Sequence, residues 1–306
     1  RLSAFSQSLK SFTGVLIPDF VYWLERSGTD LLGNVSLTGR PLNIDMIMKQ
    51  EVYSFYESSL FVSATLSVRN DFSFFSAATG FENGSGIVLD SPFNYREQML
   101  VYLGADLPSP EDERYPQAAA KACAHLINLL GGRCLILFTS YYMLRTVRSI
   151  LEKLVPFRIY SQDTMTASKA LGLYMADSNS VLMGTHSYWQ GIDLPGDLVR
   201  GVIITRLPFA VPDTPVMEAK FERLREAGKN PFVCLQIPEA VLKMKQGAGR
   251  LIRRGSDRGV VAVLDSRVKT KSYGQVFTDS LPVCERVSSL KDLTEKYKKM
   301  VKVQEN

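Results

Sequence analysis

Short apolar runs alternate with helix-forming stretches along most of this chain, and this alternation restricts the possible folds more than any other feature. Such runs suit strands buried on both faces, as in parallel sheets covered by helices. The predicted strands are residues 59–66, 133–140, 157–162, 180–185, 200–207 and 258–265. The predicted helices are residues 114–130, 141–153, 163–176, 215–228, 236–251 and 291–306. This order predicts an α/β fold with a parallel sheet sandwiched between helices.

The first fifty residues do not follow the alternation. We expect the stretch DFVYWLER (19–26) to be helical and residues 1–50 to be the end of an inserted or preceding element. Residues 78–92 are rich in glycine and turn formers, which predicts a linker or hairpin and a domain boundary near residue 85.

Composition indicates a globular protein, because 45% of the 306 residues are hydrophobic and 22% are charged. The length allows one large domain or two smaller ones. A net charge of +5 permits a polyanionic partner without requiring one. The sequence shows neither a signal peptide nor an apolar run long enough to span a bilayer, so we expect a soluble, cytoplasmic protein. Because position 1 is arginine, we expect a piece of a longer protein.

Cysteine and histidine spacing gives no indication of a metal centre. The cysteines show no CxxC-type spacing, which predicts ordinary reduced thiols, one of them in the core of a strand. The two histidines have no second ligand in view, so we expect no metal site at either. These residues are Cys123, Cys134 (the strand residue), Cys234, Cys284, His125 and His186.

Hydroxyl residues follow two of the predicted strands. The tetrapeptide SATL contains Ser63 and Thr65, and LFTSY contains Thr139, Ser140 and Tyr141. The carboxyl ends of parallel strands commonly hold ligands, and a helix N-terminus can bind phosphate. Taken alone, SATL is better interpreted as a helix cap with a neighbouring turn, and LFTSY is equally compatible with a helix cap and with a phosphate site.

The loop GTHSYWQGIDLPG (184–196) is more specific. It begins where a predicted strand ends and combines glycines with Thr185, a tryptophan at position 189 and a carboxylate at Asp193. Glycines such as Gly191 allow a close backbone approach. A surface loop without a function does not require this combination of residues. The combination therefore favours a functional loop.

The basic stretch QGAGRLIRR (246–254) lies at the end of a predicted helix. Helical spacing would place Gln246, Arg250 and either Arg253 or Arg254 on one face. The two glycines within it suggest close packing or backbone approach. Arginine matches phosphate oxygens with a planar, permanently charged fork. Taken alone, however, the stretch is better interpreted as a solvated basic patch.

The four motifs SATL, FTSY, GTxxxWxGxD and QxxGRxxR occur in the order of motifs III to VI of superfamily 2 helicases. Together they resemble the DinG/XPD-like group of DNA helicases, and most closely its bacterial DinG-type members. Further similar stretches are YWLER, GRPLNID, LDSPFNYREQM, ITRLPFAVPDTPV and GAGRLIRRGSDRGVVAVLDSRV. The resemblance covers residues 15–270 and implies a RecA-like fold.

The chain departs from this family in one respect, because it has no GxxxxGK[ST] loop and no DEAH-like motif. The AGKN at 227–230 does not substitute for that loop. The resemblance then implies the end of the inserted arch region at 1–50, the last strand or strands of the first RecA-like domain and a linker at 51–84, and a complete second RecA-like domain at 85–306. We expect this chain to be inactive alone and to carry no iron–sulfur cluster, whose cysteines would lie upstream.

The resemblance also implies roles for individual residues. ATP and Mg²⁺ would be held mainly by the first motor domain, with Gln246, Arg250 and Arg253 approaching the phosphates from this chain. Gly191 and Asp193 would link the nucleotide site to the DNA-binding surface. Gln190 stands where many relatives carry Glu, and Arg254 is expected to be a surface charge. The residues expected to contact single-stranded DNA are Thr139, Ser140, Tyr141 and Thr185, and those expected to couple hydrolysis to domain movement are Ser63 and Thr65.

We therefore expect the second motor domain of an ATP-dependent DNA helicase, an NTP hydrolase that moves on single-stranded DNA in DNA repair. Its expected partners are DNA forks or R-loops and the first RecA-like domain of the same polypeptide. One alternative is a nucleic-acid-binding module with a degenerate helicase fold and no motor role. Another is an unrelated α/β enzyme for a phosphorylated metabolite, which would need a complete phosphate loop or catalytic dyad within these residues.

Overall fold

The computed structural model describes residues 2–14, 17, 19–26, 33–189, 194 and 198–302. The chain divides into two compact units. Unit 1 comprises Arg1–Ile87 and Ala210–Pro238, and unit 2 comprises Val88–Phe209 and Glu239–Asn306. The chain therefore leaves unit 2 after Phe209, contributes a segment to unit 1, and returns at Glu239. A single continuous second domain over 85–306 was expected, whereas residues 210–238 belong to unit 1.

Unit 2 is built on a parallel sheet, which has seven strands in the described part of the chain, in the order β5-β6-β4-β7-β8-β3-β9. Every neighbouring pair in it is parallel. All residues of the five inner strands are buried, as expected for strands covered on both faces. The strands are β3 (Met99–Leu103), β4 (Cys134–Leu137), β5 (Arg158–Ser161), β6 (Ser180–Gly184), β7 (Gly201–Ile204), β8 (Gly259–Val263) and β9 (Glu285–Val287).

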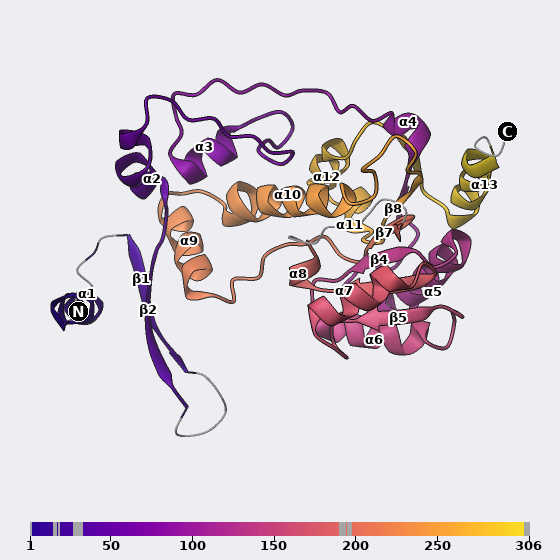
Figure 1. Ribbon diagram of the computed structural model, residues 1–306, viewed down its shortest axis with the longest axis horizontal. Helices are drawn as coiled ribbons and strands as arrows, with labels where there is room; N and C mark the ends of the chain where they lie inside the picture. Colours follow the sequence, from indigo (N-terminus) through magenta and orange to yellow (C-terminus); the bar gives the residue numbers. More distant parts are fainter. Residues whose placement is uncertain are drawn as a thin grey trace. The chain divides into compact units, whose positions relative to one another are not determined.

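Helices cover this sheet, and local sequence explains where the long ones begin and end (Figure 1). Ser140 caps the start of α6, Thr166 caps α7, and Gly131 ends α5 in the left-handed conformation that glycine adopts without strain. The helices with residues in unit 2 are α4 (Tyr95–Gln98), α5 (Tyr115–Leu130), α6 (Tyr141–Leu151), α7 (Ala167–Ala176), α8 (His186–Trp189), α10 (Ile237–Ala248), α11 (Arg267–Thr270), α12 (Gly274–Ser280) and α13 (Leu290–Lys302).

The core of unit 2 lies on both faces of the sheet. On one face, α5, α6 and α13 pack their apolar side chains against alternate strand residues; examples are Leu126, Leu144, Leu293 and Ile136. On the other face, α10 approaches β4 so closely that a Cβ on Gly247 would lie 3.0 Å from Leu137 Cδ1. The predicted α/β class is confirmed, as are the strands predicted at 133–140, 157–162, 180–185, 200–207 and 258–265.

Unit 1 has a different organisation. In its described part, an antiparallel hairpin of β1 (Phe20–Arg26) and β2 (Val35–Pro41) forms a long ribbon (Figure 1). The Arg223 guanidinium donates to Asp19 Oδ1, joining α9 to the start of this hairpin. The other elements are α1 (Leu2–Gly14), α2 (Asp45–Glu51), the 3₁₀ turn η1 (Tyr53–Phe55), α3 (Ser73–Thr79), α9 (Pro215–Glu226) and the π-helical turn η3 (Phe232–Gln236).

Two predictions for unit 1 are wrong. Residues 19–26 were expected to be helical, but 20–26 form β1, because valine and aromatic residues fit a pleated strand and find a partner in β2. Residues 59–66 were expected to form a strand, but they are irregular, with Leu60 88% and Val62 83% exposed. A strand needs a neighbour for its backbone hydrogen bonds, and the described residues pair none with this segment.

Candidate functional site

Three neighbouring strands, β5, β6 and β4, bring polar residues to the carboxyl edge of the sheet. Thr139 and Ser140 follow β4, and both are exposed. Ser140 adopts an extended conformation, and its hydroxyl accepts a hydrogen bond from the backbone N–H of Met143 at 3.2 Å. Ser140 is therefore a helix cap in this structure, which was the alternative interpretation of the FTSY motif. Tyr141 opens α6 with its side chain 49% exposed.

Thr185 follows β6 and is held by a residue that follows β5. Its backbone N–H donates to Gln162 Oε1 at 2.6 Å, and its hydroxyl lies 3.3 Å from the same oxygen. The amide nitrogen of Gln162 donates to Ser187 Oγ. With Thr185 only 5% exposed, this network fixes the first turn after β6.

Trp189 joins three of the sequence motifs. It ends α8, is 3% exposed, and donates from Nε1 to the carbonyl oxygen of Phe138 at 2.9 Å. A Cβ on Gly247 would lie 3.2 Å from its Cζ3, so α10 approaches the indole ring at a position where only glycine avoids crowding. The close packing expected for this glycine is confirmed. The FTSY, GTHSYW and QGAGR stretches thus meet around one buried indole.

Arg250 also contacts Trp189. It is 6% exposed, and its Nη2 donates to the backbone carbonyl of Trp189 at 2.8 Å. Gln246, one of the expected partners of Arg250, lies half-buried in the last turn of α10. The structure therefore places Gln246 and Arg250 at the C-terminal end of α10, with Arg250 against the loop that follows β6.

The helical spacing predicted for the remaining arginines is wrong, because α10 ends at Ala248. The backbone N–H groups of Arg253 and Arg254 both donate to Asp257 Oδ2 at 2.8 Å, which folds this stretch into a turn. Both arginine side chains are exposed. The carboxylate of Asp257 offers these two N–H groups an acceptor that a continued helix would not use, which stabilises the turn.

Four expected positions lie elsewhere. Gly191 and Asp193, with the neighbouring Gln190, lie outside the described residues. Ser63 and Thr65 belong to unit 1, where the backbone N–H of Thr65 donates to Ser63 Oγ at 3.2 Å and the two hydroxyl oxygens lie 3.3 Å apart.

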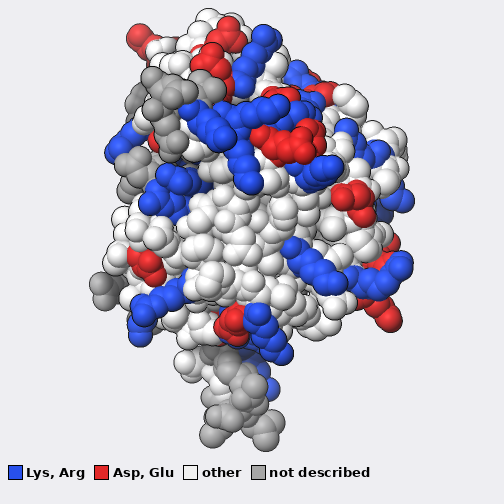
Figure 2. Space-filling model, turned by 90° about the vertical axis from the view of Figure 1, so that its right-hand side faces the viewer, with Lys and Arg blue, Asp and Glu red and all other residues white. Residues whose placement is uncertain are grey.

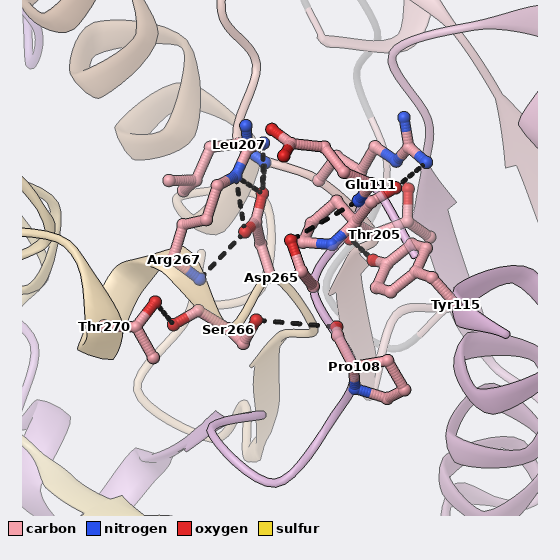
Figure 3. A network of polar contacts seen from close by, with 12 residues as sticks. Pro108, Glu111, Tyr115, Thr205, Leu207, Asp265, Ser266, Arg267 and Thr270 are labelled. Atoms are coloured by element: carbon pink, nitrogen blue, oxygen red, sulfur yellow. Dashed lines mark hydrogen bonds and ion pairs between the residues drawn. The ribbon is translucent and has the colours of Figure 1, made fainter. Parts of the chain in front are cut away.

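A second polar network, which the motifs did not indicate, lies at the carboxyl ends of β7 and β8 (Figure 3). The Asp265 carboxylate is fully buried and accepts from the backbone N–H of Leu207 at 2.8 Å. It also forms an ion pair with Arg267, whose Nη2 lies 2.7 Å from Asp265 Oδ2. The Arg267 guanidinium lies over the ring of Phe209 at 5.5 Å. Asp265 directly follows the strand-like run GVVAVL, so a carboxylate at a strand end was the available signal.

This network fixes the point where the chain leaves unit 2. Phe209 is the last residue before the segment that joins unit 1, and its ring packs edge-on against Tyr273 and Phe277, each at 5.6 Å. Burial lowers the pKa of Arg267, but the hydrogen bonds to Asp265 and the negative charge of Asp265 together outweigh this effect, and the pKa is raised. Arg267 therefore stays charged and anchors the exit of the chain.

Within the described ranges, no group of three or more His, Cys, Asp and Glu side chains is arranged to hold a metal ion. Cys123 and Cys134 are buried, as expected for the strand residue Cys134, whereas Cys234 is exposed. No helix in the described part of the chain has the length and apolar character needed to cross a membrane.

Comparisons with known proteins identify relatives of this chain. Residues 123–284 match the family described as the helicase C-terminal domain. The chain is 34% identical over 290 residues to the ATP-dependent DNA helicase YoaA of Haemophilus influenzae, covering 95% of this chain and 45% of the relative. It is 34% identical over 283 residues to the ATP-dependent helicase DinG of Mycobacterium tuberculosis, covering 90% and 42%. It is 33% identical over 275 residues to the 3'-5' exonuclease DinG of Bacillus subtilis, covering 86% and 29%.

The chain thus spans less than half the length of these relatives. Among solved structures, the fold is similar to one titled XPD_APO, with a TM-score of 0.63 and 19% identity over 94% of this chain and 59% of the other. A second, titled XPD_Helicase, gives a TM-score of 0.59 with 19% identity over 92% and 50%. At this identity the similarity supports the fold alone.

Proposed function

Because the chain belongs to the helicase C-terminal domain family and to its DinG-type members, with a RecA-like unit 2, we propose that it supplies the second motor domain of an ATP-dependent DNA helicase. The observation that carries this proposal is the junction at Trp189. There the buried Arg250 donates to the backbone of Trp189 after β6, and the indole of Trp189 donates to the carbonyl of Phe138 after β4. Such a junction can transmit a change at a nucleotide to a surface that binds a nucleic acid strand.

ATP is the substrate in this proposal, and the residues present fit its phosphates. Arg250 supplies a planar, permanently charged guanidinium that can stabilise charge developing on the transferred phosphoryl group. Gln246 precedes it by four residues, in the last turn of α10, and Arg253 follows on an exposed turn. No carboxylate cluster of the described residues fits Mg²⁺, so the metal would be held by a first motor domain. Gly191 and Asp193 would connect the nucleotide to the strand-binding edge.

The carboxyl edge of β4 and β6 is the proposed place for single-stranded DNA. Thr139 and Ser140 present hydroxyls at the N-terminal end of α6, where the helix dipole favours a phosphate. Thr185 would act through the backbone turn that it stabilises. Tyr141 and Tyr142 are 49% and 76% exposed, and aromatic side chains of this kind stack on bases of any sequence. Ser63 and Thr65 would couple hydrolysis to movement of the motor domains.

The test uses an enzyme that joins this chain to a first motor domain. Arg250→Lys keeps the charge but loses the planar fork, so nucleotide binding should persist while DNA-stimulated ATP hydrolysis falls on the order of 10³-fold. Arg254→Lys, at an exposed position, is the matched control and should leave the rate unchanged. Equal thermal unfolding of both variants would show that the fold is intact. Retained hydrolysis by the Arg250→Lys enzyme would contradict the role proposed for Arg250 at the phosphates.

Strand binding is tested on this chain alone. Tyr141→Ala should weaken binding of a labelled single-stranded oligonucleotide by about 1–3 kcal/mol, and Tyr141→Phe should retain most of the affinity, because stacking needs only the ring. Equal binding by both variants and the unchanged protein would contradict the placement of the strand at this edge.

A further inference from the structure

The exposed Ser187 stands at the same edge of the sheet as Ser140. Leu137, the last residue of β4, pairs in register with Gly184, the last residue of β6. Each serine follows the end of its strand by three residues, so the two positions correspond. Because neighbouring strands lie about 4.8 Å apart, both serines belong to the carboxyl edge where the single strand is proposed to bind.

The side chain of Gln162 determines where the hydroxyl proton of Ser187 points. A backbone N–H can only donate, so the amide atom of Gln162 that faces the N–H of Thr185 must be Oε1. The distance from this oxygen to the Thr185 nitrogen is 2.6 Å. The other end of the amide is then Nε2, which donates to Ser187 Oγ. Because this oxygen accepts a hydrogen bond, its own proton points away from Gln162.

Gln162 is itself held in place. Its backbone N–H donates to the carbonyl of Met183 at 3.2 Å, which extends the pairing of β5 and β6 by one residue. The amide of Gln162 lies so close to Gly184 that a Cβ there would come within 2.7 Å of Oε1. The glycine leaves room for the amide, and the strand pairing fixes the backbone that carries it. Such support keeps a partner group in one orientation.

Thr185 and Ser187 use the same amide in opposite directions. Thr185 Oγ1 lies 3.3 Å from Gln162 Oε1, and since a carbonyl oxygen cannot donate, the hydroxyl of Thr185 donates inward. Thr185 is only 5% exposed, whereas Ser187 is exposed. Within the described ranges, Ser187 Oγ has no second hydrogen-bond partner. Of these two hydroxyls, that of Ser187 therefore presents its proton to solvent.

Ser140 directs its proton in the same way. Its Oγ accepts from the backbone N–H of Met143 at 3.2 Å, which leaves the proton available to an external acceptor. Phosphate oxygens are acceptors, and serine hydroxyls are among their common donors in nucleic acid complexes. Ser140 and Ser187 thus offer donors of one kind, from neighbouring strand ends, to the backbone of a single strand.

We propose that Ser187 donates a hydrogen bond to a phosphate of the bound single strand, and that Gln162 is the positioning residue that turns its proton outward. The inference rests on the proposed function for the presence of a strand at this edge. A hydroxyl contact to the backbone adds affinity without reading the base sequence. Because the hydroxyl is neutral, the contact releases no counterion and its contribution is independent of salt.

Other parts of the surface also attract a polyanion. On the face shown in Figure 2, which carries α13, Lys and Arg side chains are more frequent than Asp and Glu. Such a surface binds phosphates through its charge, and the affinity then falls steeply with salt. Loss of a neutral hydroxyl lowers the affinity but leaves this salt dependence as it was. The salt dependence therefore separates the Ser187 contact from binding by charge.

The experiment measures binding of a fluorescein-labelled oligo(dT) strand to this chain by anisotropy over a range of salt concentrations. Ser187→Ala should weaken binding about fivefold, as for one hydrogen bond of typical net strength, and leave the slope of log K against log salt unchanged. Ser149→Ala is the matched control. Ser149 is also an exposed serine on a helix, but it donates its proton to the carbonyl of Thr146 at 2.9 Å. This control should bind the strand like the unchanged chain.

Gln162→Glu tests the positioning role. A carboxylate still accepts from the Thr185 N–H but has no proton to donate, so Ser187 would donate to it and turn its own proton inward. In the Gln162→Glu chain, Ser187→Ala should therefore change the affinity less than about twofold. Both chains in this comparison carry the added negative charge, so its repulsion cancels. If Gln162 only supports the fold, Ser187→Ala will still weaken binding about fivefold, which would overturn the positioning role.

Equal affinities of Ser187→Ala and Ser149→Ala would overturn the contact, and so would a changed salt slope in Ser187→Ala. The two proposals fail separately. Loss of binding in Tyr141→Ala but not in Ser187→Ala removes the contact and leaves the proposed function standing. Weaker binding in Ser187→Ala together with full hydrolysis by the Arg250→Lys enzyme leaves the contact standing and removes the role of Arg250. Unchanged affinity in both Tyr141→Ala and Ser187→Ala would remove the strand from this edge, and the contact with it.

Discussion

Two ion pairs of unit 2 have the same sequence spacing and contact length but differ in burial, and this difference predicts unequal contributions to stability. In both, the arginine follows the aspartate by two residues and its Nη2 lies 2.7 Å from Oδ2. The Asp265 side chain is 0% exposed and that of Arg267 is 19% exposed, whereas the side chain of Arg114 is 80% exposed beside Asp112.

Asp265→Ala should lower the free energy of unfolding by about 3–5 kcal/mol, because it leaves a buried charge without its partner. Part of this loss arises at Leu207, a residue that is 2% exposed. Its backbone N–H would lose its acceptor, which costs about 1–3 kcal/mol. Partial access of water to Arg267 moderates the remainder. Asp112→Ala should cause no measurable change, since solvent screens its pair.

Urea unfolding provides the assay, with Trp189 fluorescence as the probe of unit 2. The chain has two tryptophans, so Trp23→Phe in unit 1 makes Trp189 the single reporter. A double-mutant cycle with Arg267→Leu should show a coupling energy of about 1–3 kcal/mol for the buried pair. A loss below about 1 kcal/mol for Asp265→Ala, or additive effects of the two substitutions within about 0.5 kcal/mol, would refute the reasoning.

Three further outcomes are expected. Ser140→Ala should lower the free energy of unfolding by about 1 kcal/mol in the same urea assay, because it removes the cap of α6. Gly184→Ala should cost about 1–3 kcal/mol, since its Cβ would lie 2.0 Å from Tyr188 Cδ2, whereas Gly172→Ala, with no atom within 4 Å, should stabilise helix α7 by up to about 1 kcal/mol. At pH 8 a thiol reagent should label the exposed Cys234 rapidly and Cys284 slowly, because burial raises the pKa of Cys284 to about 11; equal rates would contradict this difference.

Apolar patterning predicted most of unit 2 because its strands are buried on both faces, so every residue of a strand such as Gly201–Ile204 contributes to the signal. The same apolar pattern gave a wrong strand prediction at 59–66, because an apolar run forms a strand only beside a partner strand. Strand β9 has three residues and gives almost no pattern of its own. In unit 1, burial does not alternate along β1, so its sequence carries no strand period.

The candidate site was predictable in part. The order of the motifs gave no contact between Trp189 and Arg250, which the structure shows. The turn at Arg253 and Arg254 was not predicted, because it depends on the carboxylate of Asp257 folding back onto the chain. The importance of Asp265 was also missed, since its partner Leu207 lies on another strand's loop, far away in sequence. Contacts between distant residues of this kind leave no local pattern.

The departure of the chain from unit 2 after Phe209 has a consequence for synthesis on the ribosome. Unit 1 contains both its first segment and residues 210–238. The ion pair between Asp19 and Arg223 therefore forms only after Arg223 has emerged from the ribosome. By then most strands of the parallel sheet have been made, but β8 and β9 have not. Unit 1 therefore stays incomplete until residue 238 has been made, and unit 2 stays incomplete during most of the last quarter of the chain, when its exposed apolar surface is open to chaperones and to aggregation.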